Sequence, residues 1–166
     1  RGCRVVVNGR SQASVDAAVQ SLSQQHDPAQ FVGIAAEVSD QAQVQALWDG
    51  AVARFGSVDI WINNAGLDIY QKPLWELPLE DIDRVIDVNM KGMVYGSYIA
   101  LHGMLKQGKG TIYNMEGYGS SGMKTAGKTT YGSTKYALRY FTQSLQKEVK
   151  DTPVIVGTMS PGIVTT

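Results

Sequence analysis

The sequence predicts an α/β fold built on a doubly wound parallel sheet. Short apolar, β-branched runs alternate along the chain with longer segments whose apolar residues recur at helical spacing. Strands that alternate with helices form parallel sheets, and right-handed crossovers place the helices on both faces. Each short run also ends in a polar loop, and such sheets bind ligands at the edge where their strands end.

Strands and helices are expected in strict alternation, in the order strand 3–7, helix 11–25, strand 31–34, helix 40–54, strand 58–62, helix 80–106, strand 111–115, helix 130–150 and strand 154–158. The first strand stops at Asn8-Gly9, a turn-forming pair, and Ser11 can cap the helix that follows. Gly56 ends the second helix. The inward stripes of these two helices are Val15, Ala18, Val19 and Leu22, and Val44, Leu47, Trp48 and Ala51.

The third strand, VDIWI, is nearly continuous in apolar residues, which is typical of a strand buried on both faces. Pro73 and Pro78 lie in the loop after it. A long helix, a fourth strand and a glycine-rich loop follow. The fourth helix then begins with Tyr131 and Lys135, and the fifth strand ends at Ser160-Pro161-Gly162.

The composition is that of one globular domain, residues 1–166, with a core of its own. Lys and Arg together number 15, as do Asp and Glu, so no charge excess points to nucleic acid or an anionic membrane. Cys3 is the single cysteine, which excludes an internal disulfide framework and a thiolate metal cluster, and no metal site is expected. No apolar run is long enough to span a bilayer. The chain has no initiator methionine or signal peptide, and we expect an internal fragment.

Tyr131 and Lys135 form the pair on which a catalytic interpretation depends. Residues four apart on a helix lie on one face, so the phenol and the ammonium are expected side by side. An ammonium favours the phenolate, so Lys135 is expected to lower the pKa of Tyr131 and make it a proton donor.

An ordered set of motifs strengthens this interpretation. Asn63-Asn64-Ala65-Gly66 follows the third strand, Tyr131 to Lys135 opens the helix after the fourth, and Ser160-Pro161-Gly162 follows the fifth. This set resembles the short-chain dehydrogenase/reductase family over essentially the whole chain. The resemblance implies a Rossmann-like sheet, incomplete here at both ends, because the match begins at the family's second strand and stops before its substrate-covering segment.

The resemblance also implies roles for single residues. Tyr131 is the proton donor, Lys135 tunes it and binds the nicotinamide ribose, and Asn89 holds a relay water. The remaining cofactor contacts implied after the third and fifth strands are Asn63, Asn64, Ala65 and Gly66, and Pro161, Gly162 and Thr166.

The residues that decide between NAD and NADP are expected directly after the first and second strands of this chain. Arg10 and Ser11 stand where the family carries either an acid for the ribose hydroxyls of NAD or an arginine for the 2′-phosphate of NADP. No acid is present there, so NADP is favoured, although a simple exposed arginine would give the same sequence. Glu37-Val38 occupies the position beside the adenine, where the family usually has Asp-Val.

Two features depart from the family. The diphosphate loop TGxxxGxG is absent, and the GxGxxG pattern at 117–122 is read as an active-site loop because no long helix follows it. The family's catalytic serine is also absent, since the fourth strand ends in Asn114-Met115-Glu116-Gly117. Ser120 is the favoured replacement, with Ser121 and Tyr118 as alternatives.

The strand end NMEG, its glycine-rich loop and YGSTK resemble the chlorophyll b reductase branch. The function expected is an NADPH-dependent reduction of a carbonyl to an alcohol, with the 7-formyl group of chlorophyll(ide) b as a candidate substrate. The alternative is a non-catalytic NADP-binding partner of the same fold. A homodimer or homotetramer is expected, through helices 80–106 and 130–150 (Ile82, Val85, Ile86; Tyr136, Tyr140, Phe141, Leu145). The expected location is cytoplasmic, or plastid or thylakoid-associated if the chlorophyll branch is right.

Overall fold

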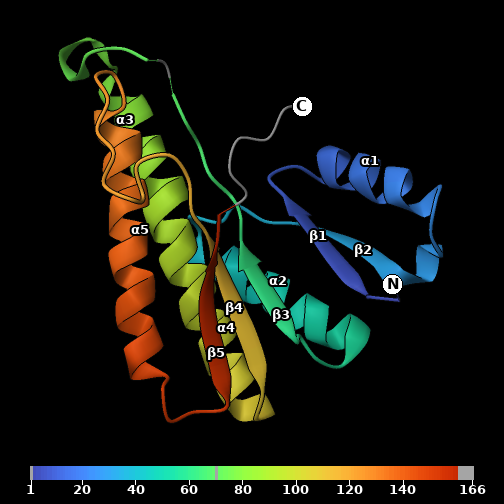
Figure 1. Ribbon diagram of the computed structural model, residues 1–166. Coiled ribbons are helices and arrows are strands. Elements are labelled where there is room, and N and C mark those ends of the chain that lie inside the picture. Colours follow the sequence, from blue (N-terminus) through green and yellow to red (C-terminus); the bar gives the residue numbers. More distant parts are fainter. Residues whose placement is uncertain (1, 70, 161–166) are drawn as a thin grey trace. The chain divides into compact units, whose positions relative to one another are not determined.

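The computed structural model describes residues 2–69 and 71–160, so the predicted contacts of Pro161, Gly162 and Thr166 lie outside the described residues. The chain divides into two compact units, an N-terminal unit of residues 1–58 and a C-terminal unit of residues 59–166. Each unit combines parallel strands with helices (Figure 1). In the part of the chain described, no helix is both long and apolar enough to cross a bilayer.

The N-terminal unit is a two-stranded parallel sheet with two helices. Its elements are β1 (Val5–Gly9), α1 (Gln12–Ser23), a 3-10 turn η1 (Pro28–Gln30), β2 (Phe31–Ala35) and α2 (Gln41–Phe55). Ser11 caps α1 by accepting a hydrogen bond from the backbone N–H of Ser14 at 3.3 Å. A Cβ on Gly33 would lie 2.2 Å from Cγ1 of buried Val15, so the packing of α1 on β2 requires glycine there.

The C-terminal unit is a three-stranded parallel sheet in the order β3-β4-β5, with helices packed on it (Figure 1). Its elements are β3 (Ile60–Asn63), a 3-10 turn η2 (Leu74–Glu76), α3 (Leu79–Ile86), η3 (Asp87–Lys91), α4 (Gly92–Gln107), β4 (Gly110–Met115), α5 (Thr129–Glu148) and β5 (Val154–Met159). Parallel strands joined through helices confirm the predicted α/β fold class.

The predicted helix 80–106 contains a break in its regular winding. α3 and α4 are joined by η3, a single π-helical turn in which the backbone N–H of Gly92 bonds to the carbonyl of Asp87. A π turn inserts one extra residue into a helix and is common at functional sites. Here it carries Asn89, which is 2% exposed.

A buried amide network ties the sheet of the C-terminal unit to its helices. Asn63 of β3 donates to Asn114 Oδ1 of β4 at 2.8 Å and to Ser97 Oγ of α4 at 3.0 Å. Asn63 also accepts from Trp61 Nε1 at 2.8 Å, and Asn114 donates to Thr142 Oγ1 of α5 at 2.9 Å. Because a buried amide left unpaired is costly, these bonds fix the register of two strands and two helices together.

The prediction that the third strand is buried on both faces is wrong for the described residues. Ile60 and Ile62 of β3 are 58% and 48% exposed. Side chains alternate along a strand, so the face that carries Trp61 and Asn63 turns toward α4 while the two isoleucines point to the other face.

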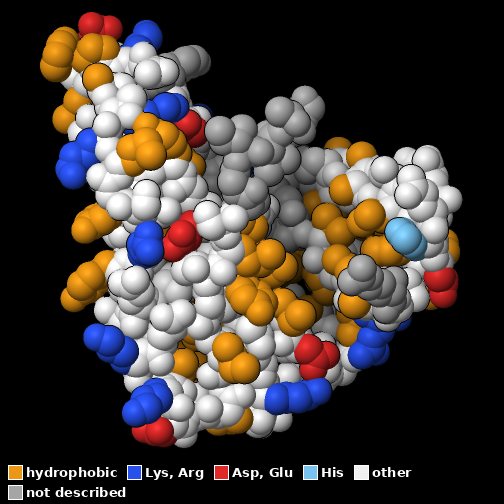
Figure 2. Space-filling view, in the orientation of Figure 1, with side chains coloured by type: hydrophobic (Ala, Val, Ile, Leu, Met, Phe, Trp, Pro, Cys, Tyr) orange, Lys and Arg blue, Asp and Glu red, His pale blue; other side chains and the backbone are white. Residues whose placement is uncertain are grey.

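Tyr136 and Tyr140 of α5 are exposed as well, and Figure 2 shows hydrophobic side chains projecting from the surface along this helix.

We predict that Gly96→Ala destabilises the protein by about 1–3 kcal/mol, because the new methyl group overpacks the contact between α4 and β3. A Cβ at Gly96 would lie 2.1 Å from Asn63 Oδ1. Gly132→Ala in α5 is the matched control, since a Cβ at that position would meet no atom within 4 Å, and it should stabilise by about 0.5–1 kcal/mol. Urea unfolding of both variants checks this, and equal stabilisation by both would contradict the packing argument.

Candidate active site

Tyr131 and Lys135 lie on the first turns of α5, as the sequence predicts. Lys135 is 5% exposed, and its Nζ donates to the carbonyl of Met115, at the end of β4, at 3.2 Å. The same Nζ lies 5.8 Å from the centre of the Tyr131 ring. The pair is therefore held at the carboxyl end of β4, the edge where ligands bind in parallel α/β sheets.

Gly117 lies directly against the hydroxyl of Tyr131. A Cβ at this position would be 2.7 Å from Tyr131 Oη and 3.2 Å from Lys135 Cε. The space that a side chain would fill at residue 117 is thus already taken by the phenol and the lysine stem. The replacement of the family's serine sequence by Glu116-Gly117 therefore brings the loop backbone, and not a hydroxyl group, to Tyr131.

The expected pKa of Tyr131 is wrong in direction. Burial, and then the nearby carboxylate of Asp68, raise the pKa of Tyr131 above its ordinary value. Burial also lowers the pKa of Lys135, because desolvation disfavours the ammonium. The ammonium is bonded to the Met115 carbonyl and lies 5.8 Å from the ring centre. Its stabilisation of the phenolate is therefore weaker than the opposing effects of burial and of Asp68. Tyr131 consequently stays protonated at neutral pH.

Asn89 connects the loop after β3 to α5. Its Oδ1 accepts from the backbone N–H of Leu67 at 2.7 Å, and its Nδ2 donates to the Leu67 carbonyl at 2.9 Å and to Thr134 Oγ1 at 3.0 Å. Thr134 in turn donates to the carbonyl of Tyr131 at 2.7 Å. Asn89 thereby fixes the backbone that carries the candidate proton donor, and its predicted relay role stays a prediction.

The Asn63–Gly66 segment divides into a buried part and an exposed part. Asn63 belongs to the amide network, whereas Asn64, Ala65 and Gly66 are exposed beyond the end of β3. A Cβ on Gly66 would lie 3.5 Å from Lys135 Nζ and 3.7 Å from Asn89 Oδ1. The exposed part of the motif therefore borders both predicted functional side chains.

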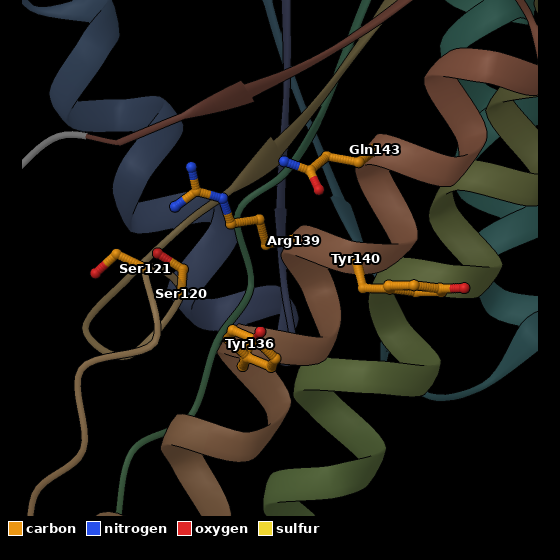
Figure 3. Close-up of a pocket in the computed structure, with 6 residues that line it drawn as sticks. All are labelled: Ser120, Ser121, Tyr136, Arg139, Tyr140 and Gln143. Atoms are coloured by element: carbon orange, nitrogen blue, oxygen red, sulfur yellow. The ribbon is translucent and has the colours of Figure 1, made fainter.

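Ser120 does not lie free beside Tyr131 as a replacement hydroxyl. It is 5% exposed and donates to Glu116 Oε2 at 3.4 Å, while Glu116 Oε1 lies 3.9 Å from Arg139 Nε. Figure 3 shows Ser120 and Ser121 on the loop facing Arg139 and Tyr136 of α5. An open hollow of about 280 Å³ is lined by Ser120, Ser121, Tyr136, Arg139, Tyr140 and Gln143.

This hollow lies on a different side of α5 from Tyr131. The helix residues that line it are spaced three to four apart, and they alternate with the buried face that includes Lys135 and Leu138. The alternative hydroxyl, that of Tyr118, bonds to Thr125 Oγ1 at 2.5 Å within the exposed loop. The Ser120 assignment remains a prediction, and its present partner is a carboxylate.

The predicted cofactor residues of the N-terminal unit lie where its strands end. Arg10 is exposed immediately after β1, and Ser11 is the cap of α1. Glu37 follows β2, where its Oε1 accepts from the backbone N–H and the hydroxyl of Ser39 at 3.2 and 3.1 Å. Val38 lies partly buried beside it. β1 and β2 are paired in register from Val5 to Gly9, so these residues share one edge of their sheet.

Sequence reasoning missed three residues beside Tyr131. Thr134 links Asn89 to the Tyr131 carbonyl, and Lys128 and Asp68 form an ion pair of 2.5 Å. Lys128 Nζ lies 5.8 Å from the centre of the Tyr131 ring. The spacing of Lys128, three residues before Tyr131, could have drawn attention to that lysine, but nothing in the sequence pairs it with Asp68.

Each unit, taken by itself, holds residues whose chemistry suits part of a nicotinamide dinucleotide. An ammonium carries three donors, and among the described residues the bond of Lys135 to Met115 uses one, so two remain for ribose hydroxyls. The exposed guanidinium of Arg10 has the planar fork that pairs with a phosphate. Within the described residues, no group of three His, Cys, Asp or Glu side chains could hold a metal ion.

The parallel strands and their helices define a Rossmann-like α/β protein. Its candidate site combines a buried lysine, a half-buried tyrosine and an asparagine in a π turn. The family model for short chain dehydrogenases matches residues 1–166. The chain belongs to the short-chain dehydrogenase family.

Its relatives include plant enzymes with a named substrate. A protein from Arabidopsis thaliana named probable chlorophyll(ide) b reductase NYC1, chloroplastic, is 39% identical, and the match covers 99% of this chain and 36% of that protein. The chlorophyll(ide) b reductase NOL, chloroplastic, from Oryza sativa is 37% identical, with 99% and 50% covered. The chain therefore spans about a third to a half of the length of these relatives.

Solved structures share the fold. A closed form of serine dehydrogenase complexed with NADP⁺ is 30% identical with a TM-score of 0.86, covering 99% of this chain and 64% of that one. A short-chain dehydrogenase/reductase from Burkholderia phymatum in complex with NAD is 27% identical with a TM-score of 0.87, covering 97% and 57%. Members of the family with this fold thus hold either nicotinamide cofactor.

Proposed function

We propose that this protein is an NADPH-dependent oxidoreductase that reduces a carbonyl to an alcohol. The observation that carries the proposal is the arrangement of Tyr131, whose hydroxyl lies at Gly117 and whose helix also presents the buried Lys135. The phenol, whose pKa is raised above its ordinary value, is protonated at neutral pH and so has a proton to donate.

In this reaction the side chains of the protein have to supply one proton. When bound, NADPH supplies a hydride for the carbonyl carbon. Tyr131 Oη donates its proton to the carbonyl oxygen, so the C=O bond becomes a CH–OH group and the tyrosine is left as a phenolate. Lys135 holds ribose hydroxyls and stabilises that phenolate, and Asn89 positions the relay by which Tyr131 regains a proton.

The substrate that we propose is an aldehyde on a large, flat ring, as in the 7-formyl group of chlorophyll(ide) b. Two relatives that match nearly all of this chain are named for that substrate. The loop from Gly117 to Gly122 supports the proposal, because glycines let a backbone approach a flat ligand closely. A plastid location goes with this substrate.

NADP is the cofactor that we propose, on the strength of Arg10. The guanidinium is exposed at the end of β1, and it can form charge-assisted hydrogen bonds to a 2′-phosphate. The carboxylate of Glu37, which could compete for ribose hydroxyls, is bonded to Ser39 in its own loop.

We also propose a homodimer or homotetramer that forms through α5. Tyr136 and Tyr140 are 59% and 74% exposed on the side of this helix that turns away from the sheet. Val85 and Leu145, which the sequence also offered as interface residues, are buried within the C-terminal unit.

Tyr140→Asp should therefore lower the molar mass measured by light scattering, because it places a charge in the proposed interface. An unchanged mass would contradict an interface on this helix.

Tyr131→Phe should keep NADPH binding and lose about 10²–10⁴-fold in turnover, because the proton donor is removed and the ring is retained. Stopped-flow NADPH oxidation with an aldehyde substrate measures turnover, and NADPH fluorescence measures binding. Tyr140→Phe is the matched control on the same helix, and it should leave turnover unchanged.

Two outcomes would contradict the proposal. Turnover of Tyr131→Phe within a few-fold of the wild type would show that the proton comes from another group. A wild-type protein that binds NADPH yet reduces no aldehyde or ketone, chlorophyll b derivatives included, would favour the non-catalytic NADP-binding partner.

Arg10→Ser should raise the Kd for NADPH about 10- to 100-fold and leave that for NADH nearly unchanged, because only NADPH carries the 2′-phosphate. Fluorescence titration with both cofactors measures the two constants. Arg4→Ser, before β1 at the opposite end of the strand, is the matched control. An equal loss of affinity for both cofactors would show that Arg10 does not bind the 2′-phosphate.

A further inference from the structure

An ion pair joins two loops beside Tyr131. Lys128, the residue before α5, places its Nζ 2.5 Å from Oδ2 of Asp68, which follows the Asn63–Gly66 segment. The two residues are 60 positions apart in the sequence. The pair therefore fixes the start of α5, three residues before the candidate proton donor, to the loop that leaves β3.

The contact between these loops extends beyond the two charges. Gly127 has a φ of +79°, and a Cβ there would lie 2.7 Å from Gln71 Cγ and 3.0 Å from the Gln71 carbonyl carbon. Only glycine suits both the left-handed backbone and this close approach. The ion pair is thus part of a packed loop contact, in which the Lys128 side chain is 22% exposed.

Both members of the pair lie near the same phenol. Lys128 Nζ lies 5.8 Å from the centre of the Tyr131 ring, and the charge of Asp68 disfavours its phenolate. Lys135 Nζ lies at 5.8 Å as well. Glu116, the carboxylate next to Gly117, is turned to Arg139 and Ser120.

We propose that Asp68 and Lys128 are positioning residues that hold Tyr131 and set when it releases its proton, acting together as an ion pair beside it. This inference rests on the proposed role of Tyr131. While the pair is intact, the Lys128 ammonium offsets part of the effect of the Asp68 carboxylate on the phenol. If one partner is removed, the remaining charge acts on Tyr131 without the opposite charge beside it.

The two single variants should therefore shift the pKa of the Tyr131 phenol in opposite directions. Asp68→Asn leaves the Lys128 ammonium, which favours the phenolate and lowers the pKa of Tyr131. Lys128→Met leaves the Asp68 carboxylate, which raises that pKa further. The double variant should fall between them. A pair with only a structural role would move both single variants the same way or neither.

The experiment is an NMR titration of the protein labelled with ¹³Cζ-tyrosine, in which the Tyr131→Phe variant identifies the Tyr131 signal. We expect opposite shifts of about half a pH unit or more for the two single variants. Asp59→Asn is the matched control, because Asp59 pairs with Lys109 at 2.7 Å on an exposed surface, and it should leave the Tyr131 signal unchanged. Shifts of the same sign, or none, would overturn the proposal.

The titration needs no turnover, so it separates this inference from the proposed function. Opposite shifts in a protein that reduces no carbonyl would sink the reductase proposal and keep the role of the pair. Active enzyme with unshifted variants would do the reverse. If Asp68→Asn does not fold, Lys128→Met decides alone, because its expected shift is upward and a downward or absent shift overturns the proposal.

Discussion

The arrangement of the candidate site depends on the side-chain amide of Asn89. It is buried in a π turn, where it holds the Leu67 backbone in the loop after β3 and, through Thr134, the backbone at Tyr131. One amide group can satisfy both because it donates and accepts at once. Since a buried amide left without partners is costly, the π turn, the loop and α5 must form together.

The second constraint is the close approach of backbone to side chain at Gly117. The absence of a Cβ lets the loop lie against Tyr131 Oη, while Glu116 next to it turns to Ser120 and Arg139. Where the family places a serine hydroxyl, this chain has a glycine backbone and a carboxylate that holds the loop from the other side. The surroundings of Tyr131, the candidate proton donor, thus consist of the packed loop at Gly117 and the nearby Asp68–Lys128 ion pair.

Local patterns predicted the elements of the fold closely. Apolar periodicity and caps such as Ser11 are local properties, and the observed strands and helices follow them within a few residues. The exception is the interruption of the helix 80–106, because a π turn is set by what Asn89 can bond to and not by the apolar stripe. The exposed isoleucines of β3 were missed for a similar reason, since an apolar run does not show which of its faces is covered.

The sequence by itself determined the alternation of strands and helices, the family, and the placing of Tyr131 and Lys135 on one helix. These follow from short-range periodicity and ordered motifs. Only the tertiary structure decided that the pKa of Tyr131 is raised, that Ser120 bonds to Glu116, and that Lys128 meets Asp68 across 60 positions. The physical reason is that burial, charge proximity and hydrogen-bond choice depend on residues far apart in the chain, and spacing along it does not encode them.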